Sequence, residues 1–189
     1  DTPPKSCLGT GGRQIPAEGG NIFDHFHAAW EWDDGIVCHV GSRQIKGCHS
    51  ETKDIVRGEK GTLIVGKGGA PFIEGEKRWR FRGEEKNMYD LEHEALFNAI
   101  RKGEVINNGE RMMLSTLVAI MGREVAYTGQ QLTWKQITES MQDLAPDTLA
   151  WNDSFEPTPM PMPGVTKFIG APEPEKPAEA GAKAKGKKA

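Results

Sequence analysis

The stretch GNIFDHFHAAWEWDDG, residues 20–35, predicts the fold of the first half of this chain. Between residues 21 and 32 the side chains alternate between two faces, which is the period of a β-strand. One face would carry Ile22, Phe26, Ala28, Trp30 and Trp32, and the other would carry Phe23, His25, His27, Ala29 and Glu31. Asp34-Gly35 then gives a strong hairpin signal. We therefore expect a strand, a tight turn and a returning strand over residues 36–40.

Further short strands are expected on either side of this hairpin. Alternation and turn residues place them at residues 5–8, 53–57, 62–65, 72–73 and 79–81. Two glycine-rich stretches, residues 9–12 and 66–69, lack the following helix that a phosphate-binding loop needs. We expect both to be turns that use positive φ.

The second half of the chain changes to a helical period. Apolar residues recur at helical spacing over residues 89–101, and Asn108 and Gly129 can cap the two ends of a second helix. Thr133 and Gln136 have the spacing of a capping box for a short third helix. Strands followed by helices predict an α+β fold, with an open, largely antiparallel β-sheet and helices packed on one face.

Composition narrows the class of protein. The 189 residues are 37% hydrophobic and 27% charged, which is typical of one soluble globular domain. A net charge of −3 gives no reason to expect nucleic acid or an anionic membrane surface as a partner. No apolar run approaches the roughly 20 residues that a membrane span needs. The chain begins at Asp1 without a methionine, so we expect a processed or truncated piece.

Three widely spaced cysteines, Cys7, Cys38 and Cys48, predict neither a disulfide framework nor a zinc knuckle. We expect all three to be buried, inert thiols. The C-terminal part divides by composition into a Pro-rich extended segment, residues 156–170, and a low-complexity tail, residues 171–189, which we predict to be disordered. The tripeptide Glu175-Lys176-Pro177 lies in this tail and is assigned no role.

A metal site is one interpretation of the first hairpin. On a strand His25, His27 and Glu31 would project from one face, and His39 could join them across the turn. This spacing is close to the first motif of the cupins. The second cupin motif is missing, however, and the helical second half does not suit the all-β fold of that family.

Other polar groups form a second set of candidates. They are Arg13, Asp24, His25, Arg43, Tyr89 and His93. Arg13 leaves a glycine stretch, where its guanidinium could clamp a substrate oxygen. The residues alone leave a structural alternative open, in which Arg13 pairs with a loop carboxylate and His25 is a structural histidine.

Seven blocks of sequence, taken in order, resemble a known family. They are CLGTGGRQ, GNIFDHFHAAWEWDDG, SRQIKGC, VRGEKGT, YDLEHEALFNAIRKGEVINNGE, STLVAIMGREVAYTGQQLTW and PGVTKF, spread between Lys5 and Phe168. Together they resemble the C-terminal domain of the Gfo/Idh/MocA oxidoreductases, the glucose–fructose oxidoreductase and inositol dehydrogenase family. The likeness is greatest to its bacterial branch from planctomycete- and Bacteroidetes-type genomes.

The resemblance implies a function. Residues 1–155 would form the substrate-binding and oligomerisation domain, and a separate N-terminal Rossmann domain would bind NAD or NADP. The family transfers hydride between the nicotinamide and a sugar or polyol. By position, Arg13, Asp24, His25, Tyr89 and His93 would line the sugar pocket, with His25 as a candidate proton relay. His27 and Glu31 would have no such role.

The resemblance also implies partners and compartment. Family members associate through the sheet face, and Trp30 and Trp32 look like apolar groups that need cover, so we expect a homo-oligomer. Members of this branch often carry twin-arginine export signals, which would place the protein in the periplasm, and without one it would be cytoplasmic. The competing hypothesis is a stand-alone, non-catalytic carbohydrate-binding or interaction module.

Overall fold

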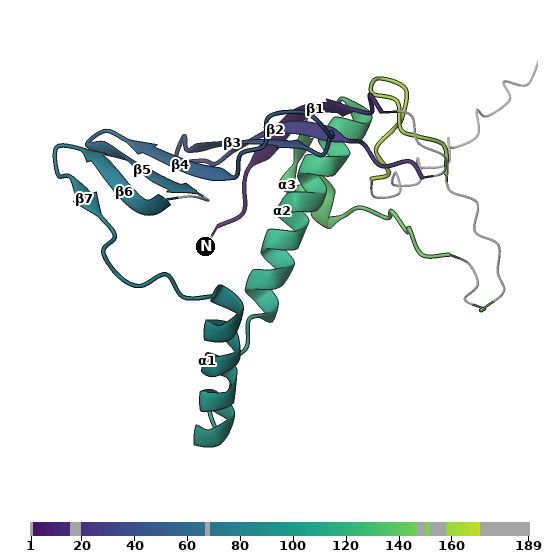
Figure 1. Ribbon diagram of the computed structural model, residues 1–189. Coiled ribbons are helices and arrows are strands. Elements are labelled where there is room, and N and C mark those ends of the chain that lie inside the picture. The colour runs from purple at the N-terminus through teal and green to yellow at the C-terminus, as the bar shows by residue number, and fades with distance from the viewer. Residues whose placement is uncertain (1, 16–19, 67–68, 147–149, 152–157, 171–189) are drawn as a thin grey trace, which may run out of the picture. The chain divides into compact units, whose positions relative to one another are not determined.

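The computed structural model describes residues 2–15, 20–66, 69–146, 150–151 and 158–170. Its elements follow the order β1 to β7, α1, α2, β8 and α3 (Figure 1). The fold is α+β, as the sequence predicts. Its strands form two open antiparallel sheets, where the sequence suggested one. The chain divides into two compact units: unit 1 comprises residues 1–44 and 113–189, and unit 2 comprises residues 45–112.

Unit 1 contains a four-stranded sheet in the order β3-β2-β1-β8. Its strands are β1 (Ser6–Gly12), β2 (His25–Glu31), β3 (Val37–Arg43) and β8 (Leu132–Thr133). The predicted turn joins β2 to β3: Gly35 has a φ of 82°, and the Asp34 carboxylate accepts a hydrogen bond from the Ile36 amide at 3.2 Å. The hairpin expected from residues 20–35 is therefore confirmed.

Helix α2 (Gly109–Thr128) covers one face of this sheet with its C-terminal part. Its buried residues all lie between Met121 and Thr128. They meet a sheet face formed by Cys7, Ala28 and Trp30, whose alternation the sequence shows. This contact between helix and sheet is the core of unit 1, and Figure 1 shows the helix crossing the strands.

Glycines in β1 allow the helix to approach. Gly9 and Gly11 lie inside this strand without positive φ, so the prediction of a turn at residues 9–12 is wrong. A Cβ on Gly9 would lie 2.8 Å from the Val125 Cγ2 atom, and a Cβ on Gly11 would lie 3.3 Å from the Ala126 Cβ atom. The missing side chains thus leave room for α2 rather than freedom for a turn.

The two tryptophans of β2 and its turn do not lie on the open face of the sheet. Trp30 is 7% exposed, and its indole N–H donates to the Val118 carbonyl oxygen at 3.2 Å. Trp32 packs partly against the same core, and its indole donates to the Thr2 carbonyl oxygen at 3.0 Å. Because Trp30 is buried and Trp32 is half-buried, they are not the uncovered apolar groups on which the expectation of self-association rested.

The cysteines correct another expectation. All three are free thiols, but only Cys7 is buried, whereas Cys38 and Cys48 are exposed. Burial raises the pKa of the Cys7 thiol to about 12. Cys7 is therefore a small, unreactive core residue, and the prediction of burial fails for the other two.

Unit 2 contains a second sheet and helix α1. The sheet has the order β4-β5-β6-β7, formed by β4 (Lys53–Gly58), β5 (Gly61–Gly66), β6 (Gly69–Gly75) and β7 (Trp79–Arg80). Helix α1 (Met88–Lys102) begins after Asn87, whose side chain accepts a hydrogen bond from the Tyr89 amide. It ends at Gly103, with a φ of 72°, as the sequence predicts.

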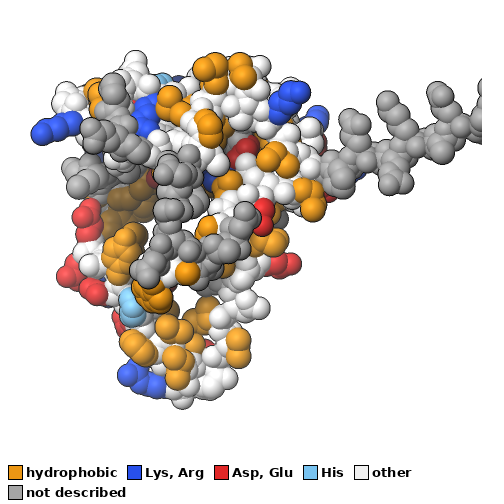
Figure 2. All heavy atoms as spheres, turned by 90° about the vertical axis from the view of Figure 1, so that its right-hand side faces the viewer, with side chains coloured by type: hydrophobic (Ala, Val, Ile, Leu, Met, Phe, Trp, Pro, Cys, Tyr) orange, Lys and Arg blue, Asp and Glu red, His pale blue; other side chains and the backbone are white. Residues whose placement is uncertain are grey.

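Helix α1 exposes an apolar stripe. Ala99 is its one buried residue, while Tyr89, Leu96, Phe97 and Ile100 are all at least 45% exposed. Figure 2 shows hydrophobic side chains gathered over this helix, at the bottom of the view. No helix in the described part of the chain is long and apolar enough to cross a bilayer.

The C-terminal elements follow the predicted caps. Gly129 has a φ of 71° after α2, and α3 (Trp134–Thr138) opens with the capping box of Thr133 and Gln136. Of the Pro-rich segment, residues 158–170 are described and Phe168 packs against the core of unit 1. The tail 171–189, with Glu175-Lys176-Pro177, lies outside the described residues. The boundaries proposed at residues 155 and 170 stay predictions.

Candidate functional site

Of the five residues expected to line the sugar pocket, three lie together where β1 ends and β2 begins. Gly12 pairs with His25 at the edge of the two strands, and the Asp24 amide donates to the Gly12 carbonyl oxygen at 3.0 Å. Arg13 follows Gly12 directly. The sheet therefore holds Arg13, Asp24 and His25 around the mouth of a single loop, which sequence separation alone does not show.

The Asp24 carboxylate organises this loop. One oxygen, Oδ2, accepts hydrogen bonds from the backbone amides of Gln14 at 2.9 Å and Ile15 at 2.8 Å. The other, Oδ1, lies 2.7 Å from Nδ1 of His25. Hydrogen bonds to the charged form, first from the Ile15 amide and then from His25, lower the pKa of Asp24. Asp24 is thus an anion that fixes both the loop backbone and the imidazole.

His25 has one ring nitrogen directed to Asp24 and one left over. The ring lies across Gly12: a Cβ there would be 3.2 Å from Cε1 and 3.4 Å from Nε2 of the imidazole. The His25 side chain is 36% exposed, against 13% for Asp24. With a proton on Nδ1 held by the carboxylate, Nε2 carries a free lone pair. The Nε2 atom can therefore accept a proton from a bound hydroxyl group and return it.

The Arg13 side chain binds the backbone of its own loop. Its guanidinium donates to two backbone carbonyl oxygens of the loop, Ile15 at 3.2 Å and Gly20 at 3.0 Å. Neither of these two contacts is the ion pair with a loop carboxylate that the structural alternative expected. Arg13 closes the loop on itself, and its contact with a substrate stays a prediction.

Tyr89 and His93 lie in unit 2, one turn apart at the start of α1. His93 Nδ1 lies 2.7 Å from the Tyr89 carbonyl oxygen, and the His93 ring packs at 6.4 Å from that of Phe97. Tyr89 is 60% exposed. The two candidates share one face of a helix in unit 2, whereas Arg13, Asp24 and His25 belong to unit 1. Their part in the sugar pocket stays a prediction.

The cupin-like metal interpretation lacks a ligand cluster. In the described parts of the chain no three His, Cys, Asp or Glu side chains come together as metal ligands do. Along a strand, His27 and Glu31 are separated by roughly 13 Å, far more than one ion can bridge. His27 instead stacks on His39 with ring centroids 5.8 Å apart. The two open sheets also differ from a closed double sheet.

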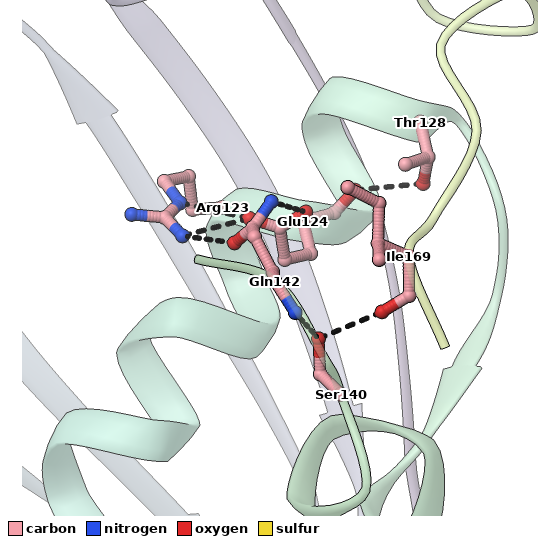
Figure 3. Close-up of polar contacts among 6 residues, drawn as sticks. All are labelled: Arg123, Glu124, Thr128, Ser140, Gln142 and Ile169. Atoms are coloured by element: carbon pink, nitrogen blue, oxygen red, sulfur yellow. Dashed lines mark hydrogen bonds and ion pairs between the residues drawn. The ribbon is translucent and has the colours of Figure 1, made fainter. Parts of the chain in front are cut away.

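Sequence reasoning missed a buried polar cluster at the C-terminal part of α2 (Figure 3). The Glu124 side chain is 5% exposed and accepts hydrogen bonds from Arg123 at 2.8 and 3.0 Å. Gln142 bonds to both residues, accepting from Arg123 at 3.0 Å and donating to Glu124 at 3.4 Å. A charged pair inside the otherwise apolar run around Met121 was the signal for this cluster.

Comparison with known proteins supports the fold. No protein-family model matches the sequence, and no curated protein matches it. Solved structures do match, among them a Thermotoga maritima protein described as an oxidoreductase, with a TM-score of 0.55, 17% identity and coverage of 68% of this chain and 40% of that one. Levoglucosan dehydrogenase, in complex with NADH and levoglucosan, matches with a TM-score of 0.55, 12% identity and coverage of 69% and 45%.

A third solved structure also matches the fold of this chain. The WlbA dehydrogenase from Bordetella pertussis, in complex with NADH and UDP-GlcNAcA, has a TM-score of 0.51, 20% identity and coverage of 69% of this chain and 39% of that one. All three neighbours are described as oxidoreductases or dehydrogenases. The chain shares a fold with part of them and spans less than half the length of each.

The Asp24 contacts predict how stability depends on pH. Because the pKa of Asp24 is lower in the folded state than in the unfolded chain, the unfolded chain takes up the proton first as the pH falls. The stabilisation is therefore complete above the ordinary aspartate pKa and is lost as the pH falls through the folded-state value. Asp24→Asn should destabilise the protein at pH 7, and the difference should shrink toward about pH 3.

Urea unfolding at the two pH values measures this effect. The control is Asp33→Asn, because the Asp33 side chain is 89% exposed and its ion pair with Lys5 is long, at 3.9 Å. A loss of stability in the Asp24 variant that is independent of pH would contradict the prediction.

Proposed function

We propose that this chain is the substrate-binding and oligomerisation half of an NAD(P)-dependent oxidoreductase that acts on a sugar or polyol. The observation that carries the proposal is the fold shared with 39–45% of the length of three oxidoreductase structures, two of them solved with NADH and a carbohydrate compound. The seven sequence blocks that resemble the same family support it. The nucleotide would be held by a Rossmann domain that is not among these 189 residues.

The described residues fit the substrate side of such a reaction and do not fit the nucleotide. Both sheets are antiparallel, and the glycines at residues 9–12 lie within β1 instead of opening a helix that could receive a pyrophosphate. Hydride acceptance or donation would therefore be supplied elsewhere. The part proposed for this chain is to orient hydroxyl groups and to move their protons.

His25 is the residue proposed to move the proton. Its Nε2 atom would take the proton of the reacting hydroxyl group during oxidation and return it during reduction, while Asp24 stabilises the imidazolium across the 2.7 Å contact. Arg13 would hold the loop, and Tyr89 and His93 would contribute from α1. Oriented in this way, the hydroxyl group presents its carbon-bound hydrogen to the nicotinamide.

Two preparations test the proposal: the isolated chain, and the product of the complete reading frame that encodes it. With a panel of sugars and polyols, nucleotide absorbance should change with the complete product and stay constant with the isolated chain. Turnover by the isolated chain would overturn the assignment of the cofactor to another domain. Binding of carbohydrate without turnover by the complete product would favour the alternative, a non-catalytic carbohydrate-binding module.

Substitution of His25 gives the sharper prediction. In the complete enzyme His25→Gln should lower kcat by roughly a hundred- to ten-thousand-fold, since glutamine cannot take up the proton. His27→Gln is the matched control, because His27 lies two residues away on the same strand and stacks on His39 instead of facing Asp24. Steady-state kinetics with the best polyol measure both variants. Equal losses in the two variants would contradict the role of His25.

Association through the open face of the unit 1 sheet also stays a prediction. That face carries Leu8, Val37, His27 and His39, and Leu8 and Val37 are 55% and 51% exposed. A homo-oligomer would therefore form through this face and not through Trp30 and Trp32.

A further inference from the structure

Residues 158–170, the strap, fold back onto unit 1 and are held there at three points. The Gly164 amide donates to the Thr128 carbonyl oxygen at 2.8 Å, at the end of α2. Phe168 packs against the core. The Ile169 carbonyl oxygen accepts a hydrogen bond from the Ser140 hydroxyl at 2.8 Å (Figure 3). The C-terminal half of the strap is therefore anchored to the most buried part of the unit.

The strap also has internal structure. The Thr166 amide donates to the Met162 carbonyl oxygen at 2.8 Å, and the Met162 amide donates to the Thr166 hydroxyl at 2.7 Å. This reciprocal pair closes a turn in which Gly164 has a φ of 82°. The turn stabilises the middle of the strap.

At that end the strap contacts the loop of the candidate site. The side-chain amide of Asn21 donates to the Thr158 carbonyl oxygen at 3.1 Å and contacts the Thr158 hydroxyl at 2.6 Å. Asn21 is separated from Thr158 by 137 residues in the sequence. No motif in either segment signals this contact.

Asn21 is well placed to influence Asp24 and His25. Gly20 precedes Asn21, and its carbonyl oxygen accepts a hydrogen bond from the Arg13 guanidinium at 3.0 Å. After Asn21, Phe23 is buried against Tyr127 of α2, with ring centroids 4.7 Å apart. Asp24 comes next, and its amide and carboxylate bond to the backbone of Gly12, Gln14 and Ile15. A displacement of Asn21 would therefore move the carboxylate that holds the imidazole.

We propose that the strap sets the position of this loop, and that Asn21 and Thr158 are positioning residues for the Asp24–His25 pair. Neither touches the imidazole. Their effect passes through the loop to Asp24 and from Asp24 to His25. The importance of His25 rests on the proposed function. The positioning role of Asn21 and Thr158 is tested without sugar or nucleotide, so it can fail independently of the proposed function.

The experiment compares four variants of the chain by amide hydrogen exchange and by NMR of the histidine ring nitrogens. Asn21→Ala removes the donor, and Thr158→Val removes the hydroxyl group while keeping the shape. Thr158→Ser restores the hydroxyl group. Thr166→Val is the matched control, because it breaks a bond of similar length inside the strap without touching the loop.

We expect about five-fold faster exchange of the Gln14 and Ile15 amides in Asn21→Ala, the loss typical of one hydrogen bond. A change in the ring-nitrogen signals of His25 should accompany it. Thr158→Val should show the same changes to a smaller extent, and Thr158→Ser and Thr166→Val should match the wild type at these positions even if their melting temperatures fall.

Two results would overturn the proposal. The first is unchanged exchange at Gln14 and Ile15 and unchanged His25 signals in both Asn21→Ala and Thr158→Val, which would make the strap a purely stabilising element. The second is an equal change in Thr166→Val, which would show that the effect does not depend on the contact between Asn21 and Thr158. Thr158 is exposed, so Thr158→Val should fold even where Asn21→Ala does not.

Discussion

A valine in place of Gly9 should lower the free energy of unfolding by about 3 kcal/mol, because it would overpack the contact between helix and sheet. A Cβ at this position would lie 2.8 Å from Val125 Cγ2 and 2.9 Å from the His27 carbonyl oxygen. The carbonyl oxygen belongs to the neighbouring strand and cannot move without breaking the ladder. Either α2 must lift from the sheet or β1 and β2 must separate.

Chemical denaturation monitored by tryptophan fluorescence measures this change, since Trp30 lies in the same contact. The matched control is Gly41→Val in β3, where a Cβ would meet no atom within 4 Å. There valine should change stability by no more than about 0.5 kcal/mol, as is usual for surface substitutions. Similar losses in the two variants would show that the glycines of β1 have no special packing role.

Replacing Arg123 by methionine should cost about 3 kcal/mol, because it would leave the Glu124 carboxylate buried without its cation. The guanidinium contributes two hydrogen bonds, at 2.8 and 3.0 Å, to one Glu124 oxygen. The remaining partner, Gln142, lies at 3.4 Å from the other oxygen and cannot compensate the charge. Urea unfolding at pH 7 measures the loss.

A double variant tests whether the charge is the cause. Arg123→Met combined with Glu124→Gln removes both charges and keeps the buried side chains close to their original volumes. Its stability should recover to within about 1 kcal/mol of the wild type, since neutral replacements of a buried ion pair are often tolerated. If the double variant is as unstable as Arg123→Met alone, packing of the arginine stem, rather than the ion pair, holds α2 to residues 140–142.

Local signals predicted most elements. Asp34-Gly35, Gly103, Gly129 and the Thr133–Gln136 box each bring their own hydrogen bonds or positive φ, so a few adjacent residues suffice to place a turn or a helix end. The alternation of β2 separated its two faces, but it did not show that α2 covers the face with Ala28 and Trp30. These features depend on interactions within a few residues of one another, and composition or spacing displays them directly.

The candidate site was predicted less completely. Asp24 and His25 are adjacent, and their contact follows from proximity in the chain. Arg13 was proposed as a substrate clamp, which stays a prediction, but its hydrogen bonds to two carbonyl oxygens of its own loop were not foreseen. Every residue has a backbone carbonyl oxygen, so the side chains of a loop do not show which carbonyl groups an arginine will bind.

The amino-acid sequence by itself determined the α+β class, the first hairpin and the glycines that end the helices, because each of these depends on short-range patterns. Only the tertiary structure decided that Gly9 and Gly11 make room for α2, that Trp30 is covered by this helix, and that Thr158 reaches Asn21. These outcomes depend on which surfaces meet in space, and contacts between residues far apart in the chain have no local pattern to announce them.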